Sequence, residues 1–160
     1  QYAAVRAFRG GTRIENYLSQ SRRILKTLCE SVCRRLTEAG AIVASPQGAF
    51  YIFPDFTPLK AHLAQQGITT SAEMCERILE ETGVAILPGS AFGRPDQELT
   101  TRIALVDFDG AKALASAEHY PLHKPLPEEF PKECCFKVIE GIDKLCEWMV
   151  NAKVTASKEN

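Results

Sequence analysis

The sequence predicts an α+β fold in which helices pack on a small, mostly antiparallel sheet of about four strands. Three observations support this prediction. Apolar residues recur at three- and four-residue steps over several long stretches, which is the spacing of amphipathic helices. Short apolar runs with β-branched residues stand between Gly, Pro and Ser residues, as strands do. These strands are too few and too short for a doubly wound sheet, so a layer of helices on a small sheet is favoured.

Length and composition indicate a soluble, intracellular protein of one domain. The 160 residues can bury a core, and 45% hydrophobic with 24% charged residues is ordinary for globular proteins. A net charge of -1 gives no basic surface for nucleic acid. No apolar run approaches the roughly 18 residues that span a membrane. The six cysteines form no CxxC pair, which favours packed thiols over a disulfide framework. We expect a single domain over residues 1–153 and a polar tail at 154–160.

The N-terminal residues already show a helical pattern. Tyr2, Val5 and Phe8 have helical spacing, although the chain begins at Gln1 and no capping residue precedes them. A chain that opens inside a pattern is expected to be a piece of a longer protein. We therefore expect a further N-terminal part before residue 1.

A long amphipathic helix is expected after the break at Gly10-Gly11. Thr12 and Glu15 match a capping box for its start, and Gly40 fits a C-terminal cap. Its polar face is interpreted as a solvated surface, and it holds Arg22, Arg23, Lys26, Glu30, Arg34, Arg35 and Glu38. Arginines near the glycines could meet a phosphate, although an exposed turn is the simpler interpretation; they are Arg6, Arg9 and Arg13.

Shorter elements follow this helix. Two strand-like runs, residues 41–44 and 49–53, flank a Ser-Pro-Gln-Gly turn and predict a hairpin. Thr70 is a capping residue for a helix that ends near Thr82. Residues 119–133 contain four prolines, which argue against regular structure. The other expected elements are a strand, a loop and a strand within residues 83–108, an alanine-rich helix at 111–118 and a last helix at 135–152.

His119 and His123 invite a comparison with zinc sites because Cys134 and Cys135 follow them. Histidine ligands at this spacing usually lie on a helix, whereas Pro121 stands between these two. Adjacent cysteines also differ from the usual CxxC knuckle. We therefore expect no metal site.

Arg102 is the residue that most needs an explanation. It lies near the start of an apolar strand, where an unpaired guanidinium is costly to bury and calls for a carboxylate or phosphate partner. The partner is either a ligand or an acid of this chain. Strand alternation places Asp107 on the face opposite Arg102, and Asp109 lies in a turn. Both acids remain open as partners at this point.

Three sequence blocks resemble one known family. They are GAFYIFPD at residues 48–55, VAILPGSAFG at 84–93 and RIAL at 102–105. In this order and spacing they look like the C-terminal part of class I/II aminotransferases, which are fold type I pyridoxal-phosphate enzymes. The resemblance covers roughly residues 1–115 and the final helix, and it implies the small domain of such an enzyme.

The resemblance implies that Arg102 binds the α-carboxylate of the substrate. The segment from Pro88 to Gly93 is similar to the one at the mouth of the substrate site, so Ser90 and Phe92 are further candidates for substrate binding. Core packing is an equally simple interpretation of Phe92. The Schiff-base lysine and most phosphate contacts belong to the family's large domain, which is expected before residue 1. We therefore assign no catalytic and no cofactor-binding residue, and we expect this piece alone to be inactive.

For the whole protein, the resemblance implies transfer of an amino group between an amino acid and a 2-oxo acid, with pyridoxal phosphate as cofactor. A homodimer in the cytoplasm is expected, and an organellar location stays open. Two alternatives remain: a noncatalytic interaction or dimerisation fragment, and another fold type I enzyme such as a lyase. In this fragment, we expect the Arg102 guanidinium to face solvent, a buffer anion or a makeshift acid, and not to be sealed against Asp107 or Asp109.

Overall fold

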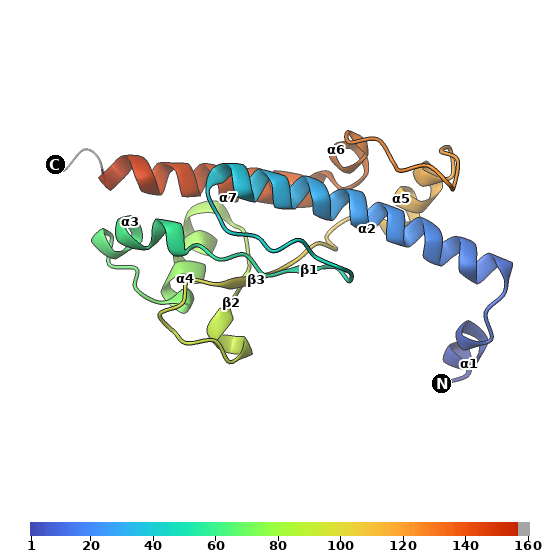
Figure 1. Ribbon diagram of the computed structural model, residues 1–160, viewed down its shortest axis with the longest axis horizontal. Helices are drawn as coiled ribbons and strands as arrows, with labels where there is room; N and C mark the ends of the chain where they lie inside the picture. Colours follow the sequence, from blue (N-terminus) through green and yellow to red (C-terminus); the bar gives the residue numbers. More distant parts are fainter. Residues whose placement is uncertain (157–160) are drawn as a thin grey trace.

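Two long helices, α2 (Thr12–Ala39) and α7 (Phe136–Ala156), lie side by side over a small sheet (Figure 1). The computed structural model describes residues 1–156, with side chains as far as residue 153. The other elements are α1 (Tyr2–Phe8), β1 (Tyr51–Ile52), the 3-10 helix η1 (Thr57–Leu59), α3 (Lys60–Gln65), α4 (Ser71–Thr82), β2 (Leu87–Pro88), the 3-10 helix η2 (Gly89–Phe92), β3 (Thr101–Ala104), α5 (Gly110–Ala117) and α6 (Phe130–Cys134). The predicted α+β class is confirmed.

The sheet has three antiparallel strands in the described part of the chain, with β3 between β1 and β2. The predicted hairpin is wrong, because residues 41–44 form no strand and only Ile42 pairs, through an isolated bridge to Asp55. Since Asp55 lies beyond β1, the residues between the bridge partners form a wide loop instead of a tight turn. β1 forms its ladder with β3, where Tyr51 pairs with Ala104.

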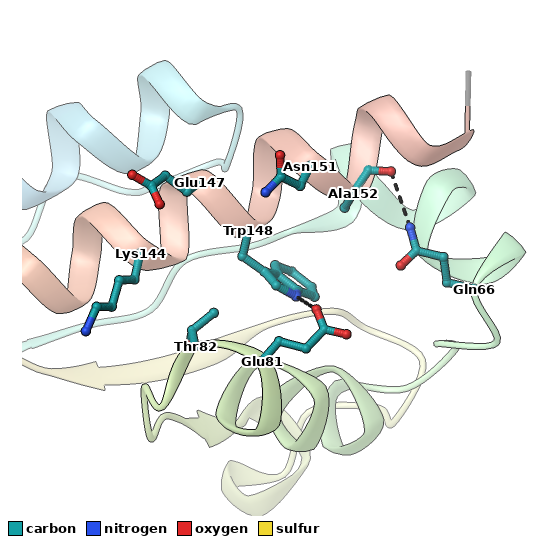
Figure 2. Close-up of a pocket in the computed structure, with 8 residues that line it drawn as sticks. All are labelled: Gln66, Glu81, Thr82, Lys144, Glu147, Trp148, Asn151 and Ala152. Carbon is teal, nitrogen blue, oxygen red and sulfur yellow. Dashed lines mark hydrogen bonds between the residues drawn. The ribbon is translucent and has the colours of Figure 1, made fainter. Parts of the chain in front are cut away.

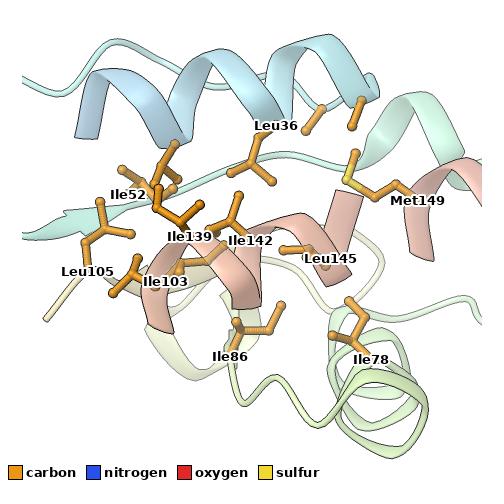
Figure 3. Packing of buried hydrophobic residues seen from close by; sticks show 14 of the residues in the cluster. Leu36, Ile52, Ile78, Ile86, Ile103, Leu105, Ile139, Ile142, Leu145 and Met149 are labelled. Atoms are coloured by element: carbon orange, nitrogen blue, oxygen red, sulfur yellow. The ribbon is translucent and has the colours of Figure 1, made fainter. Parts of the chain in front are cut away.

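One face of the sheet carries the core. In β3, Thr101 and Ile103 are buried, whereas Arg102 is half-buried and Ala104 is exposed. This alternation follows from the two-residue period of a strand. Figure 3 shows the buried side chains packed between the sheet and the long helices; they include Ile52, Ile103, Leu105, Leu36, Ile139 and Ile142. Full burial of each such side chain contributes about 1.5–3 kcal/mol.

The helix ends agree only in part with the sequence prediction. Thr70 caps α4 in a capping box, and Gly40 ends α2 with a left-handed φ of 107°, both as expected. The predicted capping box at Thr12 and Glu15 is wrong. Gly11 occupies the N-cap position of α2, so Thr12 is already the first helical residue and its side chain makes no cap hydrogen bond.

The proline-rich connection between α5 and α7 is only partly irregular. α6 begins at Phe130, inside the range 119–133 for which no regular structure was expected. Pro131 lies in the first turn of α6, where the helix does not use the N–H group that proline lacks. Proline therefore did not exclude a helix at this position.

Arg23 ties this connection to α2. Its guanidinium donates to oxygens of Pro121 at 2.6 Å, Lys124 at 2.8 Å, Gln20 at 2.8 Å, Ala117 at 3.0 Å and Tyr120 at 3.4 Å. Arg34 pairs with Glu128 at 3.2 Å, and Arg35 pairs with Asp143 of α7. The polar face of α2 is thus partly covered: its interpretation as a solvated surface is wrong for the half-buried Arg23 and Arg35, whereas Arg34 stays exposed.

The C-terminal helix crosses the expected boundary at residue 153. Its backbone is helical to Ala156, and residues 157–160 of the expected polar tail lie outside the described residues. The division into a domain and a tail stays a prediction.

All six cysteines are free thiols, as expected. Within the described residues, no helix has the length and apolar character needed to cross a membrane.

Candidate functional site

Arg102 lies on the central strand and points away from the core. In β3 it pairs with Leu87 of β2, while the next residue, Ile103, pairs with Ile52 of β1. Ile103 is buried against the helices, so its neighbour Arg102 reaches the open face of the sheet. The strand therefore fixes the backbone of the arginine on both sides.

Two aromatic rings hold the guanidinium of Arg102. Its Cζ atom lies 4.4 Å from the ring centroid of Tyr51 and 4.2 Å from that of Phe92. The ring of Phe92 meets Phe53 edge to face, with centroids 6.1 Å apart. We call Tyr51, Phe53, Phe92 and Arg102 the Arg102 cluster. Each cation–π contact contributes about 0.5–2 kcal/mol, which together can offset the roughly 2 kcal/mol of rotamer entropy that an ordered arginine loses.

The guanidinium keeps its hydrogen-bond donors available. No hydrogen bond or ion pair engages the side chain of Arg102 in the part of the chain that the structure describes. Asp109 instead caps α5, where its Oδ1 accepts the backbone N–H of Lys112 at 3.0 Å, and Asp107 is exposed. Neither acid pairs with Arg102 within the described residues, and the arginine is half-buried. The two rings as its partners were not anticipated.

The turn that carries Phe92 is packed tightly against the central strand. The N–H of Gly89 donates to the carbonyl oxygen of Thr100 at 2.7 Å. A Cβ atom at Gly89 would lie only 2.0 Å from Oγ1 of Thr100, so glycine permits this close approach. Phe92 itself is 40% exposed, which argues against the interpretation as a core residue.

Ser90 lies in the same turn but faces α4. Its backbone N–H donates to Oγ of Ser71 at 3.4 Å, and the two hydroxyls are 3.3 Å apart. Ser71 is fully buried and Ser90 is half-buried. The structure therefore brings Arg102 and Phe92 into contact, whereas the polar contacts of Ser90 attach the turn to a helix.

Sequence reasoning missed Tyr51 and Phe53. A signal was present, because strand alternation in GAFYIFPD places these two rings on one face. Their contact with Arg102 and Phe92 depends on the pairing of β1 with β3, in which Tyr51 lies opposite Ala104. That pairing joins segments far apart in the sequence, and the local pattern does not encode it.

A separate cavity lies between α4 and α7 (Figure 2). It has a volume of about 530 Å³, and Arg102 does not line it. The indole N–H of Trp148 donates to Oε2 of Glu81 at 2.8 Å, and the amide of Gln66 donates to the carbonyl oxygen of Ala152 at 3.3 Å. These polar groups bind one another across the helices, which is the arrangement of a structural contact.

The structure places no cluster of three or more His, Cys, Asp or Glu side chains suitable for a metal ion within its described residues. The Nδ1 atom of His119 lies 3.2 Å from the carbonyl oxygen of Ser116. Cys134 and Cys135 are buried, and burial raises the pKa of the Cys135 thiol to about 12. The raised pKa keeps the Cys135 thiol protonated at neutral pH.

Comparison with known proteins decides the family. The family "Aminotransferase class I and II" matches residues 1–117. This chain belongs to that family. The aspartate aminotransferase of Geobacillus stearothermophilus is 35% identical over 97 residues, which cover 60% of this chain and 23% of the relative. The aspartate aminotransferase of Pyrococcus abyssi is 38% identical over 94 residues, which cover 59% of this chain and 22% of the relative.

A solved structure of the family has a similar fold. The aromatic aminotransferase of Pyrococcus horikoshii OT3 is 26% identical and superimposes with a TM-score of 0.63, covering 95% of this chain and 31% of that structure. This chain thus spans less than a third of that structure and about a quarter of the curated relatives. Activity, substrates and partners of the whole protein are therefore matters for proposal.

The aminotransferase family implies pyridoxal phosphate as cofactor. The Arg102 cluster consists of one guanidinium, one phenol and two phenyl rings. These groups offer no amine for the aldehyde of the cofactor and no acid for its pyridine nitrogen. The cluster does not fit the cofactor, whereas a free guanidinium fork fits a carboxylate.

Proposed function

We propose that this chain is the substrate-side small domain of a pyridoxal-phosphate aminotransferase, which moves an amino group between an amino acid and a 2-oxo acid. Arg102 binds the α-carboxylate in this proposal, and Phe92 lines the same site. One observation carries it: a guanidinium with unused donors is held on the open face of the sheet in a chain of the aminotransferase family.

The proposed role follows from the chemistry of the guanidinium. Its planar fork binds both oxygens of a carboxylate in parallel, which fixes the direction of the bond to the α-carbon. Orienting the reacting bond in this way removes part of the entropic barrier of the reaction. Electron withdrawal from the substrate is the task of the cofactor, for which the cluster supplies no ligand.

The relatives support an α-carboxylate as the group that Arg102 recognises. One relative is named for aspartate and one structural neighbour for aromatic amino acids. These substrates differ in their side chains and share the α-carboxylate.

We include a cytoplasmic homodimer in the proposal. Light scattering of the full-length protein tests the dimer, and microscopy of a tagged version tests the location.

The test uses the full-length protein that contains this chain, loaded with pyridoxal phosphate. We expect Arg102→Met to lower kcat/KM for transamination at least about 30-fold, because loss of one partner of a buried charge pair costs about 2–5 kcal/mol. Arg22→Ala is the control, since Arg22 is exposed. Unchanged kcat/KM in Arg102→Met would refute the role of Arg102. Absence of cofactor binding would favour an interaction domain, and amino-acid turnover without a 2-oxo acid would favour a lyase.

A further inference from the structure

We propose that Tyr51 is a positioning residue for the substrate carboxylate. Together with Phe92, its ring fixes the plane of the Arg102 guanidinium and leaves the N–H donors free. This inference rests on the proposed function of Arg102 as the carboxylate ligand. It adds a residue from a different strand, which acts through the arginine and does not itself contact the substrate.

The geometry distinguishes two ways to hold an arginine. All five N–H donors of a guanidinium lie in its plane, so an acidic partner would occupy the donors that a substrate needs. The rings of Tyr51 and Phe92 instead meet the cation through their π faces, at 4.4 Å and 4.2 Å from Cζ. The arginine is therefore oriented while its charge and its donors remain available.

The two rings reach Arg102 from opposite sides of the central strand β3. Tyr51 belongs to β1 on one side of β3, and Phe92 ends the turn that follows β2 on the other side. Each ring is supported by a further ring: the centroids of Tyr51 and Phe50 are 4.4 Å apart, and those of Phe92 and Phe53 are 6.1 Å apart. The position of the guanidinium thus depends on all three strands.

The experiment compares Tyr51 variants of the full-length, cofactor-loaded enzyme. We expect Tyr51→Leu to lower kcat/KM about 5- to 30-fold, mainly through a higher KM for the amino acid. Tyr51→Phe keeps the ring and should stay within about 2-fold of the wild type. Tyr17→Leu is the matched control, because Tyr17 is an exposed tyrosine of α2 that lies outside the Arg102 cluster. The midpoint of urea denaturation and the cofactor content show whether a variant is folded and loaded.

A double-mutant cycle with Arg102→Lys separates positioning from general structural damage. If Tyr51 acts through the arginine, Tyr51→Leu has little further effect once the guanidinium is absent. An equal loss in both backgrounds, or no loss in the wild-type background, would overturn the inference. The proposed function fails separately, when Arg102→Lys itself leaves kcat/KM unchanged. A costly Arg102→Lys with a harmless Tyr51→Leu would leave the proposed function in place and remove only the role of Tyr51.

Discussion

Arg23 and Arg102 are both half-buried arginines, and their surroundings are opposite. Arg23 donates to four backbone carbonyl oxygens and one side-chain amide oxygen. The side chain of Arg102 lies against two aromatic rings, and no described oxygen accepts a hydrogen bond from its guanidinium. Both terminal nitrogens of the Arg23 guanidinium donate to oxygens, although its Nε has no partner among the described residues, whereas the Arg102 guanidinium donates to no described oxygen.

This difference separates a structural arginine from a binding one. The terminal nitrogens of Arg23 donate mostly to the connection that it anchors, so a ligand at these nitrogens would have to displace protein acceptors. The donors of Arg102 need no such exchange, because its contacts use the face of the guanidinium. Exposure alone does not reveal this distinction, since both side chains are partly covered.

The largest expected effect is the one on activity at Arg102. Arg102→Met should reduce kcat/KM of the full-length enzyme by at least about 30-fold, while the free energy of unfolding changes by less than about 1 kcal/mol. The methionine can still pack between the two rings, which limits the loss of stability. Enzyme kinetics and urea denaturation of the same preparation measure both quantities. If Arg102→Met lowered the free energy of unfolding but kept its kcat/KM, Arg102 would be the structural arginine and not the binding one.

Gly89→Ala tests how firmly the ring of Phe92 is placed. The new Cβ atom would meet Oγ1 of Thr100 at 2.0 Å and its carbonyl oxygen at 3.0 Å, so the turn must move away from β3. We expect a loss of about 2–3 kcal/mol in the free energy of unfolding, together with a lower kcat/KM. Gly48→Ala is the control, because a Cβ atom at that position would have no neighbour within 4 Å. Equal stability of the two variants in urea would show that the turn is not constrained.

Arg23→Ala should lower the stability of the protein and leave its activity unchanged. Loss of the guanidinium leaves carbonyl oxygens of the connection without their donor, which costs about 1–2 kcal/mol of stability. The kcat/KM of the folded enzyme should not change. Arg22→Ala, at the exposed neighbouring position, should stay within about 0.5 kcal/mol of the wild type. A loss of activity without a loss of stability in Arg23→Ala would contradict the structural role.

Thiol labelling can locate the change caused by Arg23→Ala. Burial raises the pKa of the Cys135 thiol to about 12, so the folded protein keeps this proton when an unfolded thiol, with a pKa near 8.5, has lost it. Stability therefore falls as the pH rises from about 8.5 toward 12. At pH 8 we expect slow alkylation of Cys135 in the wild type and faster alkylation in Arg23→Ala, measured by mass spectrometry. An unchanged rate of Cys135 alkylation would show that the connection between α5 and α7 stays packed on the protein without Arg23.

The smallest effect is expected at the ion pair of Arg34 with Glu128. Its side chains are 50% and 78% exposed, and solvent screens such a pair. Glu128→Gln should change the free energy of unfolding by less than about 0.5 kcal/mol, as measured by urea denaturation. A loss as large as that of Arg23→Ala would mean that charge pairs, and not the carbonyl contacts, hold the connection.

Local patterns predicted the long helices and drew attention to Arg102. The spacing of apolar residues gave α2, α4 and α7, and the apolar strand around Arg102 showed that its charge needs an explanation. The capping box at Thr12 failed although its residues match, because Gly11 already serves as the N-cap. Local chemistry permits several starting points for a helix, and tertiary structure selects one.

Contacts between distant segments could not be predicted. Arg23 meets Pro121 across 98 positions of the chain, so its role was invisible in the pattern of one helix. Tyr51 depends likewise on the pairing of β1 with β3, which also replaced the predicted hairpin. Sequence reasoning named Arg102 and Phe92 as candidates, whereas the contribution of Tyr51 and Phe53 required the pairing of the sheet.

The alternation along β3 has a consequence for folding accuracy. If the strand slipped by one position against its neighbours, Ile103 would become exposed and the Arg102 guanidinium would enter the apolar layer. Burial of an unpaired cation is strongly unfavourable. A misaligned sheet would therefore lose the burial of Ile103 and also pay for a buried guanidinium. The outward-facing arginine thus disfavours the wrong strand register. The correct register places the guanidinium, which is the proposed carboxylate ligand, on the open face of the sheet.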